Sequence, residues 1–185
     1  GPANYHQVRL DPLQPDTAYV YRLKASAGWS EWHQFRTAKA TFAPFSFIYL
    51  GDTQNDILAI ASRTIRQALR SVAHPALVVH AGDLVASRDD LAHDDEWGEW
   101  NQAGGWSYAA IPQLTAFGNH EYLETLNPDG SESRSLSPHV TAQFALPRNG
   151  APGVAATSYF SDYQNVRFVV LDGTSALDLD RKSTR

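Results

Sequence analysis

The stretch FSFIYLGD (residues 45–52) indicates the fold class, because a nearly continuous apolar run ends there in a glycine and an aspartate. Such runs are typical of strands that are buried on both faces of a parallel sheet. A second run of the same kind, ALVVHAGD (residues 76–83), places its aspartate 31 positions after the first. One β-α-β unit takes about 30 residues, so we expect two neighbouring parallel strands joined by a helix.

The segment between the two runs is predicted to be that helix. Asn55 or Asp56 is suited to cap its start, and the pair His74-Pro75 is suited to end it. The apolar residues in between recur at helical spacing, namely Ile57, Ile60, Ala61, Ile65, Ala68, Leu69 and Val72. A helix with this pattern packs its apolar face against a sheet, which predicts an α/β fold.

A third pass through the sheet follows. Residues 89–106 are polar and aromatic and are predicted to be partly helical, and the run LTAFGNHE (residues 114–121) again ends in a glycine and polar side chains. Because neighbouring parallel strands end at the same edge, we expect three polar loops at one edge of the sheet. Farther on, we expect residues 122–155 to be rich in loops and residues 158–160 to pair with 166–171 in a hairpin.

The N-terminal residues have a different pattern. Residues 7–10 are expected to form a short strand, and residues 19–23 alternate as a strand that pairs with 32–35. The string Leu13-x-Pro15-x-Thr17-x-Tyr19-x-Tyr21 resembles the tyrosine corner of fibronectin type III sandwiches, in which a tyrosine hydroxyl bonds to backbone just upstream. We therefore expect residues 1–38 to be a β-hairpin remnant, the last strands of a fibronectin type III-like domain. An unrelated hairpin extension is the alternative.

Composition excludes several classes of function. The chain has 185 residues, with 20 acidic and 15 basic ones, so a net charge of −5 gives no basic surface for nucleic acid. No apolar run approaches the roughly 18 residues of a membrane-spanning helix, and the absence of cysteine excludes disulfides and thiolate sites. The length suits the hairpin, a linker at residues 39–44 and an α/β domain at residues 45–185. A start at Gly1-Pro2 without methionine indicates a chain that is processed, that carries a scar from a cloning protease site, or that is cut from a longer protein.

The three loops carry the side chains that a metal site uses. Asp52 and Asp83 offer carboxylates, Asn119 offers an amide oxygen and His120 offers an imidazole. Divalent cations bind such ligands, and two-metal sites hold their ions about 3.5–4 Å apart. A single Gly-Asp pair is an ordinary turn, whereas three glycine-led polar loops that each end a buried strand favour a site.

The motifs Gly51-Asp52-x-Gln54, Gly82-Asp83 and Gly118-Asn119-His120-Glu121 resemble the first three of the five motifs of the calcineurin-like metallophosphoesterases. The hairpin ahead of them resembles the purple acid phosphatase branch in particular, and the resemblance extends over about residues 5–173. It implies the N-terminal half of an α/β/β/α sandwich. It also implies metal-dependent hydrolysis of phosphoesters, with phosphomonoesters as the first substrate class and phosphodiesters as the second.

The resemblance implies a role for each matching residue. Asp52 would bind the first metal, Asp83 would bridge both metals and Asn119 would bind the second. His120 would act on the substrate as proton donor or transition-state stabiliser, since imidazole titrates near neutral pH. Gln54 stands where many members have histidine and would be a weaker ligand. The implied cofactors are two divalent or trivalent ions of iron, manganese or zinc.

Three neighbouring residues complete the predicted site. Glu121 would support His120 from behind the ligands, or it is a solvated charge. His80, on the strand before Asp83, is expected in the core or behind the ligands. Purple acid phosphatases have a tyrosine three residues after the bridging aspartate, where this chain has Ala86, so a purple ferric enzyme is not expected.

The last two motifs of the family, Val-x-x-His and Gly-His-x-His, do not occur in this sequence. After His120 the only histidine is His139, in a proline-flanked segment that we expect at the surface. We therefore expect a chain truncated at both ends and inactive alone, from a parent protein that is extracytoplasmic or secreted. The alternative is a non-catalytic binding or adhesion module with a degenerate metal site. The oligomeric state cannot be derived from the sequence.

Two further clusters have ordinary explanations. Acidic residues after the second motif could bind a cation but are better explained as a solvated helix face: Asp89, Asp90, Asp94, Asp95, Glu96 and Glu99. Trp97, Trp100 and Trp106 could line a substrate cleft, but their near-helical spacing favours packing in the core or at its rim.

Overall fold

A three-stranded parallel sheet lies at the centre of the computed structural model, which describes residues 5–86, 95–154 and 157–174. Its strands are β5 (Ile48–Leu50), β6 (Val78–His80) and β7 (Gln113–Thr115), in that order across the sheet. Ile48 is opposite Val78, and Val78 is opposite Gln113. The predicted parallel strands are therefore present, each shorter than its apolar run. No helix within the described ranges is long and apolar enough to cross a membrane.

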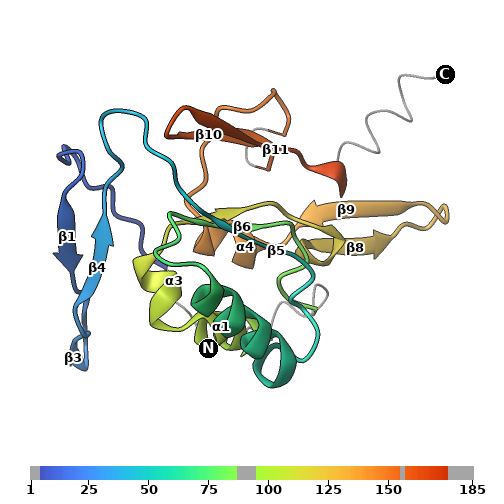
Figure 1. Cartoon of the computed structure of the whole chain (residues 1–185). Coiled ribbons are helices and arrows are strands. Elements are labelled where there is room, and N and C mark those ends of the chain that lie inside the picture. Colours follow the sequence, from blue (N-terminus) through green and yellow to red (C-terminus); the bar gives the residue numbers. More distant parts are fainter. Residues whose placement is uncertain (1–4, 87–94, 155–156, 175–185) are drawn as a thin grey trace.

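Helices cover one side of this sheet (Figure 1). A π-helical turn η1 (Ile57–Ala61) leads into α1 (Ser62–Ser71), followed later by α2 (Asp95–Gly104) and α3 (Trp106–Ala110). Asp56 takes the N-cap position, but its side chain makes no capping bond; its carbonyl instead accepts from the N–H groups of Ile60 and Ala61. The wide first turn of this helix follows from that shared carbonyl.

The main core lies between these helices and the loops at the carboxyl edge of the sheet. It is built from ten buried residues: Ile57, Ile65, Leu84, Val85, Trp97, Trp100, Ala103, Phe117, Tyr122 and Val140. Trp97 and Trp100 recur at helical spacing on α2 and turn their rings edge-on to each other, with centroids 6.0 Å apart. The prediction that these two tryptophans pack in the core is confirmed, whereas Trp106 is 71% exposed.

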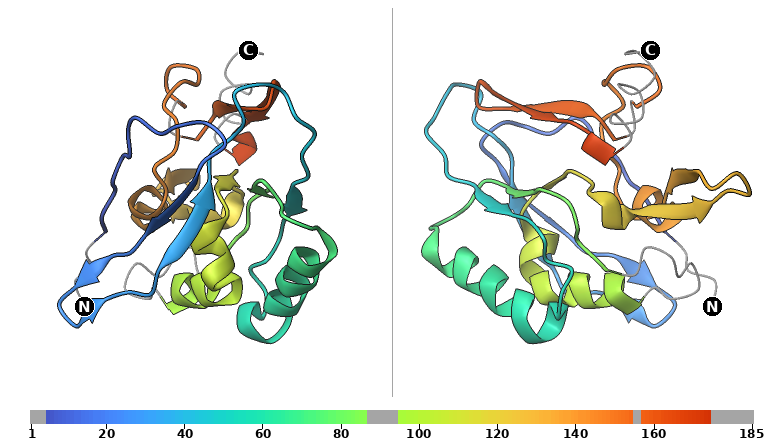
Figure 2. Two further views of the ribbon diagram at one scale, coloured as in Figure 1. Left: turned by 60° about the vertical axis from the view of Figure 1, so that its left-hand side comes forward. Right: turned by 90° about the vertical axis from the view of Figure 1, so that its right-hand side faces the viewer.

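A hairpin of β10 (Tyr159–Tyr163) and β11 (Val166–Val170) lies across the other face of the sheet (Figures 1 and 2). Its two turn residues, Gln164 and Asn165, both have positive φ, as a tight hairpin requires. A second core joins hairpin and sheet through Leu77, Leu114, Tyr159 and Val170.

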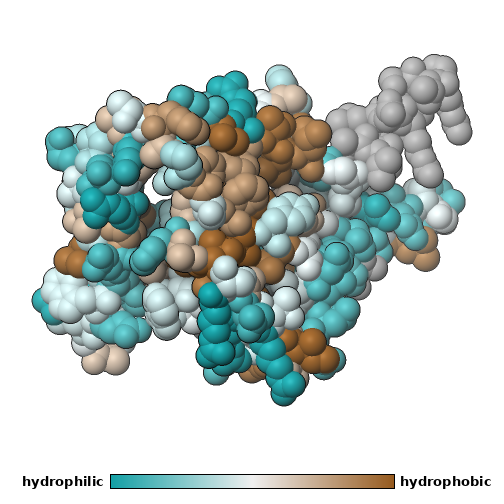
Figure 3. Space-filling model, viewed as in Figure 1, coloured by the Kyte–Doolittle hydropathy of each residue, from teal (hydrophilic) through white to brown (hydrophobic). Residues whose placement is uncertain are grey.

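The outer face of the hairpin β10–β11 carries apolar side chains beside an exposed ion pair between Asp162 and Arg167. Val170 is buried against the sheet, whereas its neighbour Val169 is 62% exposed, and hydrophobic surface gathers over this region in Figure 3. The described residues thus form helical, sheet and hairpin layers of an α/β fold, and the complete four-layer sandwich stays a prediction.

Residues 122–155 contain more regular structure than the sequence predicts. A hairpin of β8 (Tyr122–Leu126) and β9 (Glu132–Leu136) is followed by α4 (Pro138–Gln143). The expectation of a loop-rich segment was wrong here because most of β9 is exposed, so its sequence shows no alternation of apolar and polar residues.

The N-terminal residues form an antiparallel pair, β1 (Ala18–Tyr21) with β4 (His33–Arg36), tipped by a small hairpin of β2 (Lys24–Ala25) and β3 (Gly28–Trp29). The Tyr19 hydroxyl accepts a 2.8 Å hydrogen bond from the Gln14 N–H, which is the upstream backbone contact that the sequence predicts. Residues 7–10 are not a strand. Membership of a fibronectin type III-like sandwich stays a prediction.

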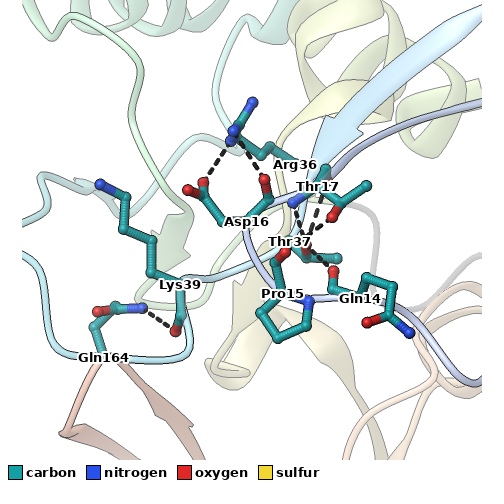
Figure 4. Close-up of polar contacts among 8 residues, drawn as sticks. All are labelled: Gln14, Pro15, Asp16, Thr17, Arg36, Thr37, Lys39 and Gln164. Carbon is teal, nitrogen blue, oxygen red and sulfur yellow. Dashed lines mark hydrogen bonds and ion pairs between the residues drawn. The ribbon is translucent and has the colours of Figure 1, made fainter.

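Two contacts join this hairpin and its linker to the α/β part. The Tyr21 hydroxyl donates to the Ala109 carbonyl of α3 at 2.6 Å. Gln164 bonds the linker on both of its polar atoms, since Oε1 accepts from the Ala43 N–H at 2.6 Å and Nε2 donates to the Lys39 carbonyl at 2.8 Å. Figure 4 shows Gln164 bonded to the Lys39 carbonyl. The linker is therefore held to the β10–β11 turn.

Candidate metal centre

The three predicted loops meet at the carboxyl edge of the sheet. The N–H of Asp52, after β5, donates to the Gly82 carbonyl at 3.2 Å, which joins the first loop to the second. The N–H of His120 donates to Asp83 Oδ1 at 3.1 Å, which joins the second loop to the third. Parallel strands with equal register bring these loops together, as the sequence predicts.

Both aspartates have left-handed backbone conformations. Asp52 has φ of 52° and Asp83 has φ of 53°, values that cost a non-glycine residue about 1–2 kcal/mol each. Aspartate tolerates this region better than most residues, and strained conformations of this kind cluster at functional sites. Because both residues leave the extended conformation, their side chains leave the backbone in a different direction from those of the strand residues before them.

Two glycines allow the second and third loops to approach each other closely. A Cβ on Gly82, whose φ is +96°, would lie 2.5 Å from the Gly118 nitrogen. A Cβ on Gly118 would lie 2.2 Å from Asp83 Oδ1. No larger residue fits at either position without moving the loops apart.

Glu121 is fully buried and bonds to backbone rather than to another side chain. Its Oε2 accepts from the N–H groups of Asp83 at 3.0 Å and Gly118 at 2.8 Å, and its Oε1 accepts from the Leu84 N–H at 2.7 Å. Burial raises the pKa of Glu121, and the three backbone donors partly oppose that shift. The alternative of a solvated surface charge is excluded by this burial, and no hydrogen bond to the His120 ring is found.

His120 is oriented by a different group. Its Nδ1 lies 3.1 Å from the Ala86 carbonyl oxygen, so a protonated Nδ1 donates to that carbonyl and Nε2 stays available for other partners. The Ala86 N–H in turn donates to Glu96 Oε2 of α2 at 3.1 Å. The sequence did not predict that Glu96 supports this loop, because a contact between a loop and a separate helix leaves no local signal in the sequence.

Gln54 and Asn119 complete the set of predicted ligands. Gln54 Oε1 is a buried oxygen without a hydrogen-bond partner, which is unusual unless another group binds it. Asn119 is exposed in the turn of 3-10 helix η2 (Asn119–Glu121). Carboxylate and amide oxygens with one imidazole suit a hard or borderline cation.

The side chains do not form a finished coordination shell. Across residues 5–86, 95–154 and 157–174, no group of three or more His, Asp or Glu side chains is arranged to hold a metal ion. The donor types and the unpartnered Gln54 oxygen fit a metal ion. The described residues, however, supply only some of the ligands that a metal ion needs.

The side chain of His80 bonds and packs against core residues of β7, α2 and α3. It is fully buried on β6, its Nε2 is 2.7 Å from Gln113 Oε1, and its ring packs between Trp100 and Tyr108 at centroid distances of 5.2 and 5.5 Å. Burial lowers the pKa of His80. These contacts are those of a neutral core histidine, which is the first of the two roles expected for His80. None of them is a contact with a predicted metal ligand, which the second role would require.

The remaining sequence candidates are placed as follows. His139 is half-buried on α4 rather than in a surface loop. Glu99 is half-buried on α2. Asp89, Asp90 and Asp94 of the acidic cluster lie outside the described residues, so the prediction of a solvated helix face stays a prediction.

Two protein-family models match the chain. The one described as "Calcineurin-like phosphoesterase" matches residues 45–182, and the one described as "Purple acid Phosphatase, N-terminal domain" matches residues 1–37. Among solved structures, a chain titled "Structure of PhoD" is similar, with a TM-score of 0.58 and 16% sequence identity over 86% of this chain and 38% of that chain. At this identity the likeness concerns the fold, and the present chain spans well under half of that structure's length. No curated protein matches.

Proposed function

Since the chain belongs to the calcineurin-like phosphoesterase family, we propose that it contributes to a metal-dependent hydrolase of phosphoesters with a dinuclear centre of iron, manganese or zinc. Phosphomonoesters are the proposed first substrate class. The observation that carries the proposal is the convergence of the loops at residues 51–54, 82–86 and 118–121 on one sheet edge, with direct hydrogen bonds between them.

Each side chain has a proposed task. Asp52 and Gln54 would hold the first ion, Asp83 would bridge and Asn119 would hold the second. Two cations at such a site would neutralise phosphoryl charge and would lower the pKa of a bound water, which makes it a better nucleophile. His120, with Nδ1 directed at the Ala86 carbonyl, would present Nε2 to the leaving oxygen and give it a proton.

Glu121 would keep this geometry without touching substrate. Its three backbone bonds fix the positions of Asp83 and Gly118 relative to each other. Because this frame already holds the metal-binding side chains in place, they would lose less conformational entropy when a metal or substrate binds.

Hydrolysis of p-nitrophenyl phosphate tests the proposal, using the protein as the cell makes it with added Mn, Fe or Zn. Asp83→Asn keeps the oxygen that accepts from His120 N–H but loses the charge, so turnover should be abolished while the fold is kept. Asp129→Asn, in the exposed β8–β9 turn, is the matched control and should keep full turnover. Equal activity in both variants would contradict the assignment.

The 185 residues alone are expected to show little turnover. The sequence has neither Val-x-x-His nor Gly-His-x-His, and the described residues offer no three-ligand group. Metal analysis that finds two stoichiometric ions in this chain would contradict that expectation. Export of the protein is also proposed, by analogy with the matched purple acid phosphatase domain, and cell fractionation tests it.

A non-catalytic binding module is the second candidate. It is favoured by an exposed aromatic group at the hairpin tip, where the Arg22 guanidinium lies 4.2 Å from the Trp29 ring and 4.5 Å from the Trp32 ring. The coding sequence after Arg185 separates the two functions. The two histidine motifs in that region would support the hydrolase, and their absence from the gene would support the binding module.

A further inference from the structure

A long cleft separates the N-terminal hairpin from the helical side of the α/β part. One section, of about 860 Å³, lies between β4, the C-terminal half of α1 and the short helix α3. A second section, of about 500 Å³, continues toward the linker and the β10–β11 turn. Arg36 and His74 line both sections, so the two form one elongated cleft.

The cleft is rich in cationic side chains on an acidic protein. Four permanent cations and two histidines line it: Arg36, Lys39, Arg66, Arg70, His33 and His74. Among the described residues that line it, only Glu31 and Asp16 are acids, and Asp16 is already bonded to Arg36 at 2.8 Å (Figure 4). The whole chain has a net charge of −5, so the excess of positive charge in this cleft is opposite in sign to the charge of the protein as a whole.

Two of these cations are free to bind a ligand. Within the part of the chain that the structure describes, the side chains of Arg70 and Lys39 make no hydrogen bond and no ion pair. Arg66 uses Nε and Nη2 on Ser62 and keeps its other guanidinium nitrogen for a further partner. A guanidinium binds phosphate oxygens through two parallel N–H donors, which lysine cannot do.

The cleft is separate from the candidate metal centre. Pro75 and Ile111, which line both of its sections, precede β6 and β7, whereas the three loops follow the strands. It therefore opens at the opposite edge of the sheet. The carbonyl end of α1 also faces this region, so an anion here would be held by side chains rather than by the amides of that helix.

We propose that this cleft binds an oligophosphate group. An elongated cavity with cations spaced along it fits a chain of phosphates better than a single one. Trp32, 60% exposed, and Trp106, 71% exposed, line the larger section and offer aromatic surface beside the phosphates. The same chemistry is present in inorganic tripolyphosphate and in a nucleoside triphosphate, and the experiment distinguishes them.

Isothermal titration with tripolyphosphate, ATP and orthophosphate tests the proposal, in low salt with EDTA present throughout. Tripolyphosphate should bind saturably, and Arg70→Ala should weaken it about tenfold, the scale of one lost charge-assisted bond. Arg63→Ala is the matched control, because Arg63 is exposed on the same helix but does not line the cleft. Circular dichroism confirms that both variants fold.

The relative affinities of the three probes identify the ligand class. Tighter binding of ATP identifies a nucleoside triphosphate as the ligand class, and ATP binding no tighter than tripolyphosphate identifies the inorganic chain. The proposal is overturned if neither probe binds, if orthophosphate binds equally well, or if Arg63→Ala weakens binding as much as Arg70→Ala. Chelation removes the metal from the measurement, so the result is independent of the proposed hydrolase activity.

Discussion

Replacement of Glu121 by glutamine tests how the loops of the candidate centre are held together. The carboxylate is fully buried and accepts three backbone hydrogen bonds, from Asp83, Leu84 and Gly118, at 2.7–3.0 Å. In Glu121→Gln one oxygen becomes an NH₂ group that faces backbone donors. At least one buried N–H then loses its acceptor.

The expected loss follows from these contacts. A buried donor left without an acceptor costs about 1–3 kcal/mol, and the remaining bonds weaken when the charge is removed. Part of this loss of stability is offset, because the neutral glutamine avoids the cost of burying a charge. That cost is what raises the pKa of Glu121. We expect the free energy of unfolding at pH 7 to fall by about 2–3 kcal/mol.

Urea unfolding and amide hydrogen exchange measure the effect. Glu124→Gln is the control, since Glu124 pairs with Arg134 at 3.2 Å on the hairpin β8–β9 and a partly exposed pair contributes about 0.2–1 kcal/mol. In Glu121→Gln the amide protons of Asp83, Leu84 and Gly118 should also exchange faster, which the control should not show. Equal destabilisation by the two variants, or unchanged exchange at the three amides, would refute the reasoning.

Three further predictions concern other parts of the structure. Gly118→Ala should destabilise by more than about 2 kcal/mol, because its Cβ would lie 2.2 Å from Asp83 Oδ1, whereas Gly130→Ala, with φ of +80° and open space around it, should cost only about 1 kcal/mol in urea unfolding. Burial lowers the pKa of His80 below its ordinary 6.5, so the unfolded chain takes up a proton that the folded one refuses; stability should fall as pH drops below 6.5, by at most about 1.4 kcal/mol per pH unit, and His80→Gln should flatten that dependence in unfolding curves from pH 7 to 5. Tyr21→Phe removes the hydroxyl bonded to the Ala109 carbonyl and should cost about 0.5–1.5 kcal/mol in thermal unfolding; an unchanged midpoint would contradict a contribution from that bond.

The central sheet could be predicted because its signals are local. Each apolar run ends in a glycine and a polar residue, and the rule that parallel strands share an edge then brings Asp52, Asp83 and His120 together without knowledge of any contact. The family was likewise predicted from the three motifs and its purple acid phosphatase branch from the hairpin ahead of them, and both are confirmed by the two family matches.

Other features could not be predicted because they depend on contacts between distant segments. The burial of Glu121 is set by loops that arrive from three strands, and nothing next to it in the sequence distinguishes it from a solvated acid. The orphaned oxygen of Gln54 is likewise visible only in three dimensions. The hairpin β8–β9 was missed because strands exposed to solvent need no apolar alternation.

The two bonds of Gln164 have a consequence for the order of folding. They join residues 121 and 125 positions apart in the chain, and contacts of such separation must wait until the intervening chain has become compact. The Ala43 amide should therefore gain protection among the last in a refolding experiment. Until then the linker is open to proteases, so a nick within residues 39–44 would mark chains whose final hairpin has not yet docked.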